Sequence, residues 1–437
     1  MNRRDFSALL LSLGLGGCSL FGGDKKVPLP GERISVLGLG AMLQPDPKLA
    51  ATPVTLPPPT ANPDWPEPGG NPQHAMGHLA LPGRLARLWQ TGIGEGSSNY
   101  TRVLAPPVVA GGRVFAMDGA VQVSAVDAAS GRILWQSDLT PKGQEGSAFG
   151  GGPCFWQGRL YVATGFAEVL ALDPANGKVI WRRGVTAPVH APPTVANGRV
   201  FAVTVDNELD VLDAADGHKL WSQNGIPETA GLLGGASPAV TRDVVVAAYT
   251  SGELFALSVE NGRALWSDNL ASSRRMNAIA ALADIRGRPV IDNGRVVAVS
   301  HSGRMASIDL RTGDRVWEQE IGSSYSPWVV GDYVFVMAND NQVVCLTRDE
   351  GKVRWLRQLP RYQDEKERSD PIMWAGPVLG GNRLIALSSR GELVSLLPHN
   401  GEIDERRPLS AGSFLEPVIA GGTLYLLNED ANLSAYR

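Results

Sequence analysis

Short runs of alternating apolar and polar residues recur along the chain, and each follows a turn rich in Gly, Asn or Asp. Such runs predict β-hairpins, because alternation gives a strand two different faces and Gly and Asn accept the turn conformation. The turns and the strand residues that follow them lie at 111–115, 157–161, 197–201, 242–246, 293–297, 331–335, 381–385 and 421–425. These eight signals predict an all-β chain.

A second pattern repeats with the hairpins: an Asp-x-x-x-Gly turn, or a close variant, followed four residues later by Trp, as in DPANGKVIW at 173–181. Gly supplies the left-handed conformation and the Asp side chain caps the turn. We expect the Trp on an outermost strand, packed between repeats with its N–H on a backbone carbonyl. A stacked cofactor is the alternative, but one ligand cannot use six scattered copies. The repeat tryptophans are Trp89, Trp135, Trp181, Trp221, Trp266, Trp317 and Trp355.

The spacing and the ends of the repeat predict the architecture. The tryptophans recur about every 44 residues, which is typical of a four-stranded propeller blade. The eighth unit stops at Arg437 without an outer strand, whereas segment 84–90 is an outer strand without a unit. Pairing the two predicts a closed eight-bladed β-propeller of four-stranded antiparallel blades over residues 80–437. In the seventh unit Glu405 takes the Trp position, so we expect that blade to be held less tightly.

The N-terminus carries an export signal. An Arg-Arg pair and a short apolar stretch precede Leu-Gly-Gly-Cys, which predicts a signal peptide over residues 1–17. The Leu-Gly-Gly-Cys ending resembles a bacterial lipobox, which implies lipidation of Cys18; an ordinary signal peptide with an incidental Cys is the alternative. Ser19 in place of Asp implies the outer membrane, facing the periplasm. The arginine pair leaves the twin-arginine export route open beside the general one.

Residues 18–79 are expected to form a tether. Eight prolines lie between Pro53 and Pro72. Because proline fixes φ and lacks an N–H, this stretch is unsuited to strand or helix interiors. The sequence therefore predicts an extended, lipidated linker between Cys18 and the propeller.

Composition narrows the chemistry. The net charge of −4 argues against a nucleic-acid-binding face, and three cysteines do not form a disulfide framework. His74 and His78 have a spacing suited to a metal, but no third ligand lies nearby. Ser, His and Asp residues are dispersed through turns without a catalytic signature. We therefore expect no enzyme, no metal and no cofactor.

Function in a repeat protein often lies where the period breaks. The longest interval between repeat tryptophans contains segment 270–286, in which apolar residues are accompanied by Arg274, Arg275, Asp284 and Arg286. An apolar loop with a charged rim suits protein recognition, although such a loop can also fold back on its own blade. Loop 231–238 occupies the equivalent place one blade earlier, so the two loops are expected on one face. A third, highly charged insertion at 361–370 is expected to be solvated.

The repeat resembles the pyrroloquinoline-quinone-like propeller family over residues 84–437. Together with the lipobox and the Pro-rich tether, it resembles the BamB family of outer-membrane β-barrel assembly lipoproteins. That resemblance implies a non-enzymatic scaffold that binds the POTRA domains of BamA through two interblade loops, with nascent outer-membrane proteins as a further possible partner. The positions that match the family's contact segments are Leu232, Leu233, Leu282 and Asp284. Leu233 replaces a frequent Arg, and Arg286 replaces a second acidic residue.

Two other functions share this repeat. Quinoprotein dehydrogenases characteristically carry a vicinal Cys-Cys pair over the quinone, whereas this chain has no adjacent cysteines. A carbohydrate- or peptidoglycan-binding propeller is the other alternative. The scaffold interpretation accounts best for the lipobox, the tether and the eight blades together.

Overall fold

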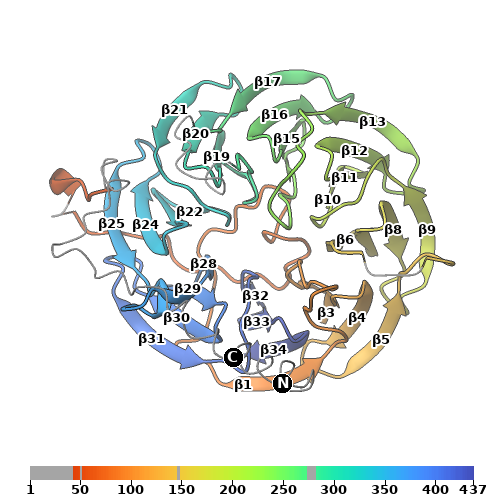
Figure 1. The fold of residues 1–437 in the computed structure, drawn as a ribbon, viewed down its shortest axis with the longest axis horizontal. Helices are drawn as coiled ribbons and strands as arrows, with labels where there is room; N and C mark the ends of the chain where they lie inside the picture. Colours follow the sequence, from red (N-terminus) through yellow and green to blue (C-terminus); the bar gives the residue numbers. More distant parts are fainter. Residues whose placement is uncertain (1–42, 50–51, 145–147, 273–281) are drawn as a thin grey trace, which may run out of the picture. The chain divides into compact units, whose positions relative to one another are not determined.

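Eight antiparallel sheets, each of four strands, stand around a common centre in the computed structural model of the chain (Figure 1). The structure describes residues 43–49, 52–144, 148–272 and 282–437. Residues 43–437 form one of two compact units, and the other, residues 1–42, lies outside the described residues with the predicted signal peptide and Cys18. Within the described ranges, no helix has the length and apolar character needed to cross a membrane. The predicted eight-bladed propeller is confirmed.

The first four blades follow one another along the chain, each with its innermost strand first (Figure 1). Blade 1 contains β2 (Val108–Ala110), β3 (Arg113–Met117), β4 (Gln122–Asp127) and β5 (Ile133–Asp138). Blade 2 contains β6 (Gly151–Trp156), β7 (Arg159–Thr164), β8 (Glu168–Leu172) and β9 (Val179–Gly184). Blade 3 contains β10 (Thr194–Ala196), β11 (Arg199–Val203), β12 (Glu208–Asp213) and β13 (Lys219–Asn224). Blade 4 contains β14 (Ala239–Val240), β15 (Val244–Ala248), β16 (Glu253–Ser258) and β17 (Ala264–Asn269).

The remaining blades continue in the same order, and two short elements lie outside them. Blade 5 contains β18 (Val290–Asp292), β19 (Arg295–Val299), β20 (Met305–Asp309) and β21 (Arg315–Gln319). Blade 6 contains β22 (Trp328–Val330), β23 (Tyr333–Met337), β24 (Gln342–Thr347) and β25 (Val353–Gln358). Blade 7 contains β28 (Trp374–Gly380), β29 (Arg383–Ser388), β30 (Glu392–Leu396) and β31 (Ile403–Pro408). The extra elements are the hairpin β26 (Tyr362–Asp364) and β27 (Ser369–Pro371), and the 3-10 turn η2 (Pro47–Leu49).

Blade 8 joins the two ends of the propeller. Its strands are β32 (Val418–Ala420), β33 (Thr423–Leu427), β34 (Asn432–Tyr436) and, outermost, β1 (Arg87–Gly92). β1 pairs antiparallel with β34, and Ala86 and Arg437 exchange two backbone hydrogen bonds of 2.8 and 2.9 Å. The predicted closure by an N-terminal strand is confirmed.

Burial within a blade explains why the hydrophobic pattern changes from strand to strand. The second strands are buried along most of their length, as in β15 and β29, because neighbouring blades cover both faces of each sheet. The outermost strands are more exposed, and β13 alternates between exposed and half-buried residues from Leu220 to Asn224, because one of its faces meets solvent. The core therefore lies between the blades.

Each repeat Trp links its blade to the next one. Trp135 of blade 1 donates its indole N–H to the carbonyl of Pro174 in blade 2, at 2.9 Å. Its ring covers Gly177, where a Cβ atom would lie only 2.6 Å from the ring. The other six tryptophans donate to the same position of the following turn, at the carbonyls of Ala128, Ala214, Val259, Leu310, Arg348 and Pro398. The repeat motif is therefore an interblade clasp.

Glu405 lies at the junction where no clasp is available. The outermost strand of blade 8 is β1, which does not follow β34 in the chain, so no turn joins these two strands to receive a Trp from blade 7. Instead the buried Arg383 donates to the carbonyl of Gly83 at 2.6 Å, and also to that of Pro82. Glu405 lies 3.8 Å from Arg383 and 2.7 Å from Arg407. Where we expected a looser blade, charged side chains hold the segment that leads into β1.

The Pro-rich segment differs from the expected tether. From residue 52 onward it contacts the blades and runs around the inside of the ring (Figure 1), with Trp65 and Leu79 buried. Proline lacks a donor, but its carbonyl still accepts: Pro66 and Pro72 each accept a backbone N–H of an innermost strand at 2.6 Å. The folded part therefore begins well before the expected boundary at residue 80.

The remaining candidate groups lie in the core. His74 and His78 each bond through Nδ1 to a backbone carbonyl, that of Pro289 and Pro57 respectively. Cys154 and Cys345 are buried and free, in blades 2 and 6. The two histidines bond backbone groups, and Cys154 donates to the buried Glu67 at 3.7 Å.

Candidate partner-binding face

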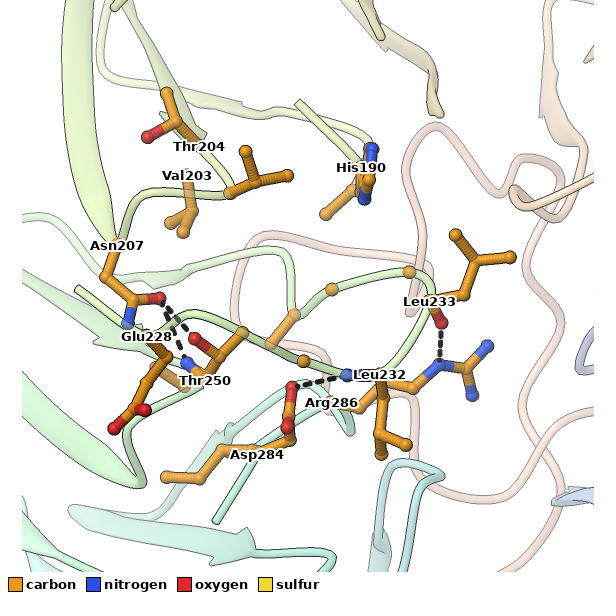
Figure 2. A pocket seen from close by; sticks show the side chains of 18 of the residues that line it. His190, Val203, Thr204, Asn207, Glu228, Leu232, Leu233, Thr250, Asp284 and Arg286 are labelled. Atoms are coloured by element: carbon orange, nitrogen blue, oxygen red, sulfur yellow. Dashed lines mark hydrogen bonds between the residues drawn. The ribbon is translucent and has the colours of Figure 1, made fainter. Parts of the chain in front are cut away.

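The two irregular loops meet at one end of the ring. The blade-4 loop, residues 226–238, precedes β14, and the described part of the blade-5 loop, residues 282–289, precedes β18. Both therefore lie where the chain enters an innermost strand. Figure 2 shows the blade-4 loop passing directly over residues of the blade-5 loop.

Asp284 of the blade-5 loop fixes the backbone of the blade-4 loop. Its Oδ1 accepts the backbone N–H of Leu232 at 3.1 Å (Figure 2). Asp284 is only 2% exposed, and burial raises the pKa of its carboxyl to about 6, against the lowering effect of the bond from Leu232. Oδ2 is buried without a hydrogen-bond partner among the described residues. This carboxylate positions Leu232 and presents no charge to the outside.

Arg286 holds the next residue of the same loop. Its Nε donates to the carbonyl of Leu233 at 2.8 Å (Figure 2), and Nη1 donates to the carbonyl of Ser324 at 3.1 Å. The guanidinium lies 5.6 Å from the ring centroid of Tyr325. One side chain thus connects the entry loops of blades 4, 5 and 6, and both its hydrogen bonds reach carbonyl groups rather than carboxylates.

The beginning of the blade-4 loop is fixed by polar side chains of blades 3 and 4. Asn207 donates to the carbonyl of Ile226 at 2.6 Å and accepts both the N–H and the hydroxyl of Thr250 at 3.0 Å (Figure 2). Glu253 accepts the N–H of Ile226 at 2.6 Å. The loop is therefore fixed by hydrogen bonds at Ile226 and again at Leu232 and Leu233, and residues 227–231 connect these two points.

The two leucines separate two cavities. On one side lies a cavity of about 360 Å³ whose mixed lining includes the polar side chains of His190, Asn207 and Glu228. On the other side lies an apolar cavity of about 270 Å³ whose lining includes Tyr325 and Phe414. Leu232, Leu233 and Arg286 line both cavities. Leu233 is 39% exposed, so its side chain reaches solvent between the two cavities.

The structure brings together most of the residues expected at this face. Leu232, Leu282 and Arg286 are half-buried, Leu233 is exposed, and Asp284 is buried. Arg274 and Arg275 lie outside the described residues. Burial changes the role of Asp284, which holds the loop from inside.

Sequence reasoning missed the supports from other blades. Asn207 occupies a left-handed turn, with φ of 61°, and such a turn is visible in the sequence as Asp-Asn. Its contact with Ile226 and that of Arg286 with Ser324 depend on blades meeting in space. No local pattern gives these pairs.

The comparison with known families agrees with the repeat. The family model described as outer membrane protein assembly factor BamB matches residues 118–357, which is more than half of the chain. The chain belongs to the BamB family. The BamB of Yersinia pestis is 26% identical over 356 residues, covering 80% of this chain and 88% of that protein.

Solved structures support the fold of this BamB family member. The crystal structure of BamB from Moraxella catarrhalis superposes with a TM-score of 0.69 at 20% identity, covering 81% of this chain and all of that one. A quinohemoprotein alcohol dehydrogenase from Comamonas testosteroni gives a TM-score of 0.64 at 13% identity, covering 86% of this chain and 80% of that one. At these identities both likenesses concern the fold alone.

Proposed function

We propose that this chain is a non-enzymatic scaffold of the outer-membrane β-barrel assembly machinery, which binds the POTRA domains of BamA through the blade-4 and blade-5 loops. The relatives in the family are named outer membrane protein assembly factors. The proposed contact centres on Leu233, with Leu232, Leu282 and the apolar part of Arg286 beside it.

One observation carries this proposal: Leu233 is exposed, and hydrogen bonds fix the backbone of both Leu232 and Leu233. Arg286 fixes the carbonyl of Leu233, and Asp284 fixes the N–H of Leu232. A pre-ordered apolar side chain loses little conformational entropy on binding, and interfaces concentrate their energy in such anchors. The loops are those for which the family resemblance implies contacts.

The charge exchange between the loops fits this role. The resemblance implies an Arg at the position of Leu233 and an acidic residue at that of Arg286. Here the cation stands on the other loop and bonds the backbone of the first, at 2.8 Å. In this chain the cation on the blade-5 loop therefore ties the two loops together.

We also propose a lipid anchor at Cys18 and a place at the periplasmic face of the outer membrane. The support is the Leu-Gly-Gly-Cys sequence followed by Ser19. For the absence of enzymatic activity, the support is the name shared by the relatives and the lack of adjacent cysteines in the sequence.

Capture of purified BamA POTRA domains by the full chain carrying Cys18→Ser tests the partner. Leu233→Asp is expected to lower the affinity at least tenfold, because it places a charge at the centre of an apolar contact. Leu265→Asp is the matched control, since Leu265 is 42% exposed on the outermost strand of the same blade. Equal loss in both variants, or none in Leu233→Asp, overturns the site. No capture by the parent chain overturns the partner.

A further inference from the structure

Residues 60–80, here called the belt, make a full circuit inside the propeller. The first half touches blades 8, 1, 2 and 3 in turn. Its bonds are Gly421 N to Asn62 O (2.7 Å), the reciprocal Trp65–Val109 pair (2.7 and 2.8 Å) and Phe155 N to Pro66 O (2.6 Å). In blade 3, the backbone of Val195 faces the buried Glu67 carboxyl group. Each blade residue belongs to an innermost strand or to the turn after it.

The second half continues through blades 4, 5, 6 and 7. Its bonds are Val240 N to Pro72 O (2.6 Å), Ile291 N to Gln73 O (2.9 Å), the indole N–H of Trp328 to Gly77 O (2.9 Å) and Gly381 N to Leu79 O (2.9 Å). Seven blades are therefore hydrogen-bonded to this one segment, and blade 3 meets it where the Glu67 carboxyl group faces the backbone of Val195. The innermost strands are sheet edges with free N–H groups, and the belt supplies acceptors to them.

The belt closes on itself and is anchored in the core. Thr60 donates its N–H to the carbonyl of His78, and Ala80 donates to the carbonyl of Thr60, both at 2.8 Å. Trp65 is 3% exposed, and its ring stacks on that of Trp328 with centroids 6.3 Å apart, which joins the blade-1 and blade-6 sides. The segment that enters at Thr60 thus leaves at Ala80 beside its own beginning.

The belt comes shortly before the strand that closes the ring. After Ala80 the chain leads directly into β1, the outermost strand of blade 8, whose pairing with β34 completes the closure. A pull on the N-terminal side of β1 would open these hydrogen bonds one after another from the Arg87 end. The belt lies between that strand and everything that precedes residue 60.

We propose that the belt is a strap that transfers a pull on the N-terminus to all eight blades and keeps it off the closing strand β1. The source of the pull rests on the proposed lipid anchor at Cys18 and on the proposed partner. The strap also holds the ring closed from inside, so the hydrogen bonds of the belt and those between β1 and β34 are expected to break in one event.

Pulling a single full-length molecule, carrying Cys18→Ser, between its N-terminus and a handle attached through Leu265→Cys on the outermost strand of blade 4 tests the strap without loading β34. A belt that peels off alone would add about 70 Å of extended chain before the ring opens. We expect no such early step in the parent chain, because belt and blades yield in one event. An early low-force step of this length in the parent chain overturns the proposal.

Variants within the belt make the test specific. Trp65→Ala removes the stacked ring and is expected to create the separate early step, whereas Ala61→Ser changes an exposed neighbour and is expected to behave like the parent. If Trp65→Ala does not fold, Asn62→Ala serves, since it removes two side-chain hydrogen bonds, to the carbonyls of Ile419 (2.6 Å) and Asp64 (3.2 Å). If the folded Trp65→Ala or Asn62→Ala variant still unfolds in the single event of the parent chain, the strap proposal is overturned.

Amide hydrogen exchange of the same proteins supplies an independent readout. Trp65→Ala is expected to speed exchange at least tenfold both in residues 60–80 and in β1 and β34. Faster exchange confined to the belt overturns the coupling. Both measurements proceed without a POTRA domain and without lipid, so failure of the proposed partner or anchor gives a different result from failure of the strap.

Discussion

The carboxylate of Asp284 accepts the backbone N–H of Leu232 at 3.1 Å, which ties the entry loops of two neighbouring blades together. An acidic residue in a partner-binding loop suggests a salt bridge to the partner. Here the carboxylate is buried beneath the loop, and one of its oxygens accepts a backbone hydrogen bond within the protein. This difference can be tested by removing the charge without removing the oxygen.

Asp284→Asn is expected to retain capture of BamA POTRA domains within about threefold, because the amide oxygen still accepts the N–H of Leu232. Asp284→Ala is expected to weaken capture about tenfold, since loss of one bond to a positioned group is worth about 1–1.5 kcal/mol. Titration by calorimetry measures both affinities. Equal losses in the two variants would indicate that the negative charge itself meets the partner.

Arg286→Lys tests the second tie. A lysine is a single point donor and cannot serve the carbonyls of Leu233 and Ser324 with a planar fork. We expect Arg286→Lys and Arg286→Ala to weaken capture to a similar extent, with a change in melting temperature of only a few degrees. Full binding by Arg286→Lys would assign the effect to charge alone.

The clasp predicts unequal effects of the same substitution at two glycines. Gly177 and Gly198 have similar φ values of 74° and 73°, but a Cβ at Gly177 meets the ring of Trp135 and one at Gly198 meets open space. Gly198→Ala is expected to cost about 1 kcal/mol of backbone strain. Gly177→Ala is expected to cost about 3 kcal/mol, because the ring must also shift. Equal shifts in the denaturant midpoint of the two variants would show that the contact between Trp135 and Gly177 does not stabilise the protein.

Glu67 makes the stability of the ring depend on pH. Burial raises its pKa from 4.5 to about 8, so the folded protein keeps a proton that the unfolded chain releases. The contribution of this group to the free energy of unfolding therefore falls as pH rises from about 4.5 to about 8, and is constant above that range.

Glu67→Gln removes this dependence. Its melting temperature relative to the parent is expected to rise between pH 5 and pH 8, by an amount that corresponds to a few kcal/mol at most. Glu228→Gln serves as a control at a carboxylate outside the belt. A constant difference between Glu67→Gln and the parent across this pH range would show that Glu67 is not held protonated in the folded protein.

The repeat made most of the fold predictable. Gly177 and Trp181 belong to a local turn and strand, and such motifs keep their spacing because each blade must reach the next in the same way. Counting the hairpin turns predicted eight blades, and the unpaired ends predicted the closure through β1. The irregular intervals also indicated which loops to consider, since an insertion interrupts a regular spacing.

The path of the Pro-rich segment was beyond prediction. Proline content excludes regular strands and helices, but it does not exclude a segment that only has to accept hydrogen bonds, as Pro66 and Pro72 do. Whether such acceptors meet donors depends on the edges of eight strands facing one centre. Those edges exist only in the assembled ring.

The sequence by itself determined the all-β class, the number of blades, the closing strand and the two loops, because these depend on local turns and on spacing along the chain. Only the tertiary structure decided that Asp284 and Arg286 hold the leucines and that residues 60–80 contact every blade. Those relationships join residues that are distant in sequence, and their energies depend on burial and distance, which arise only when the blades pack together.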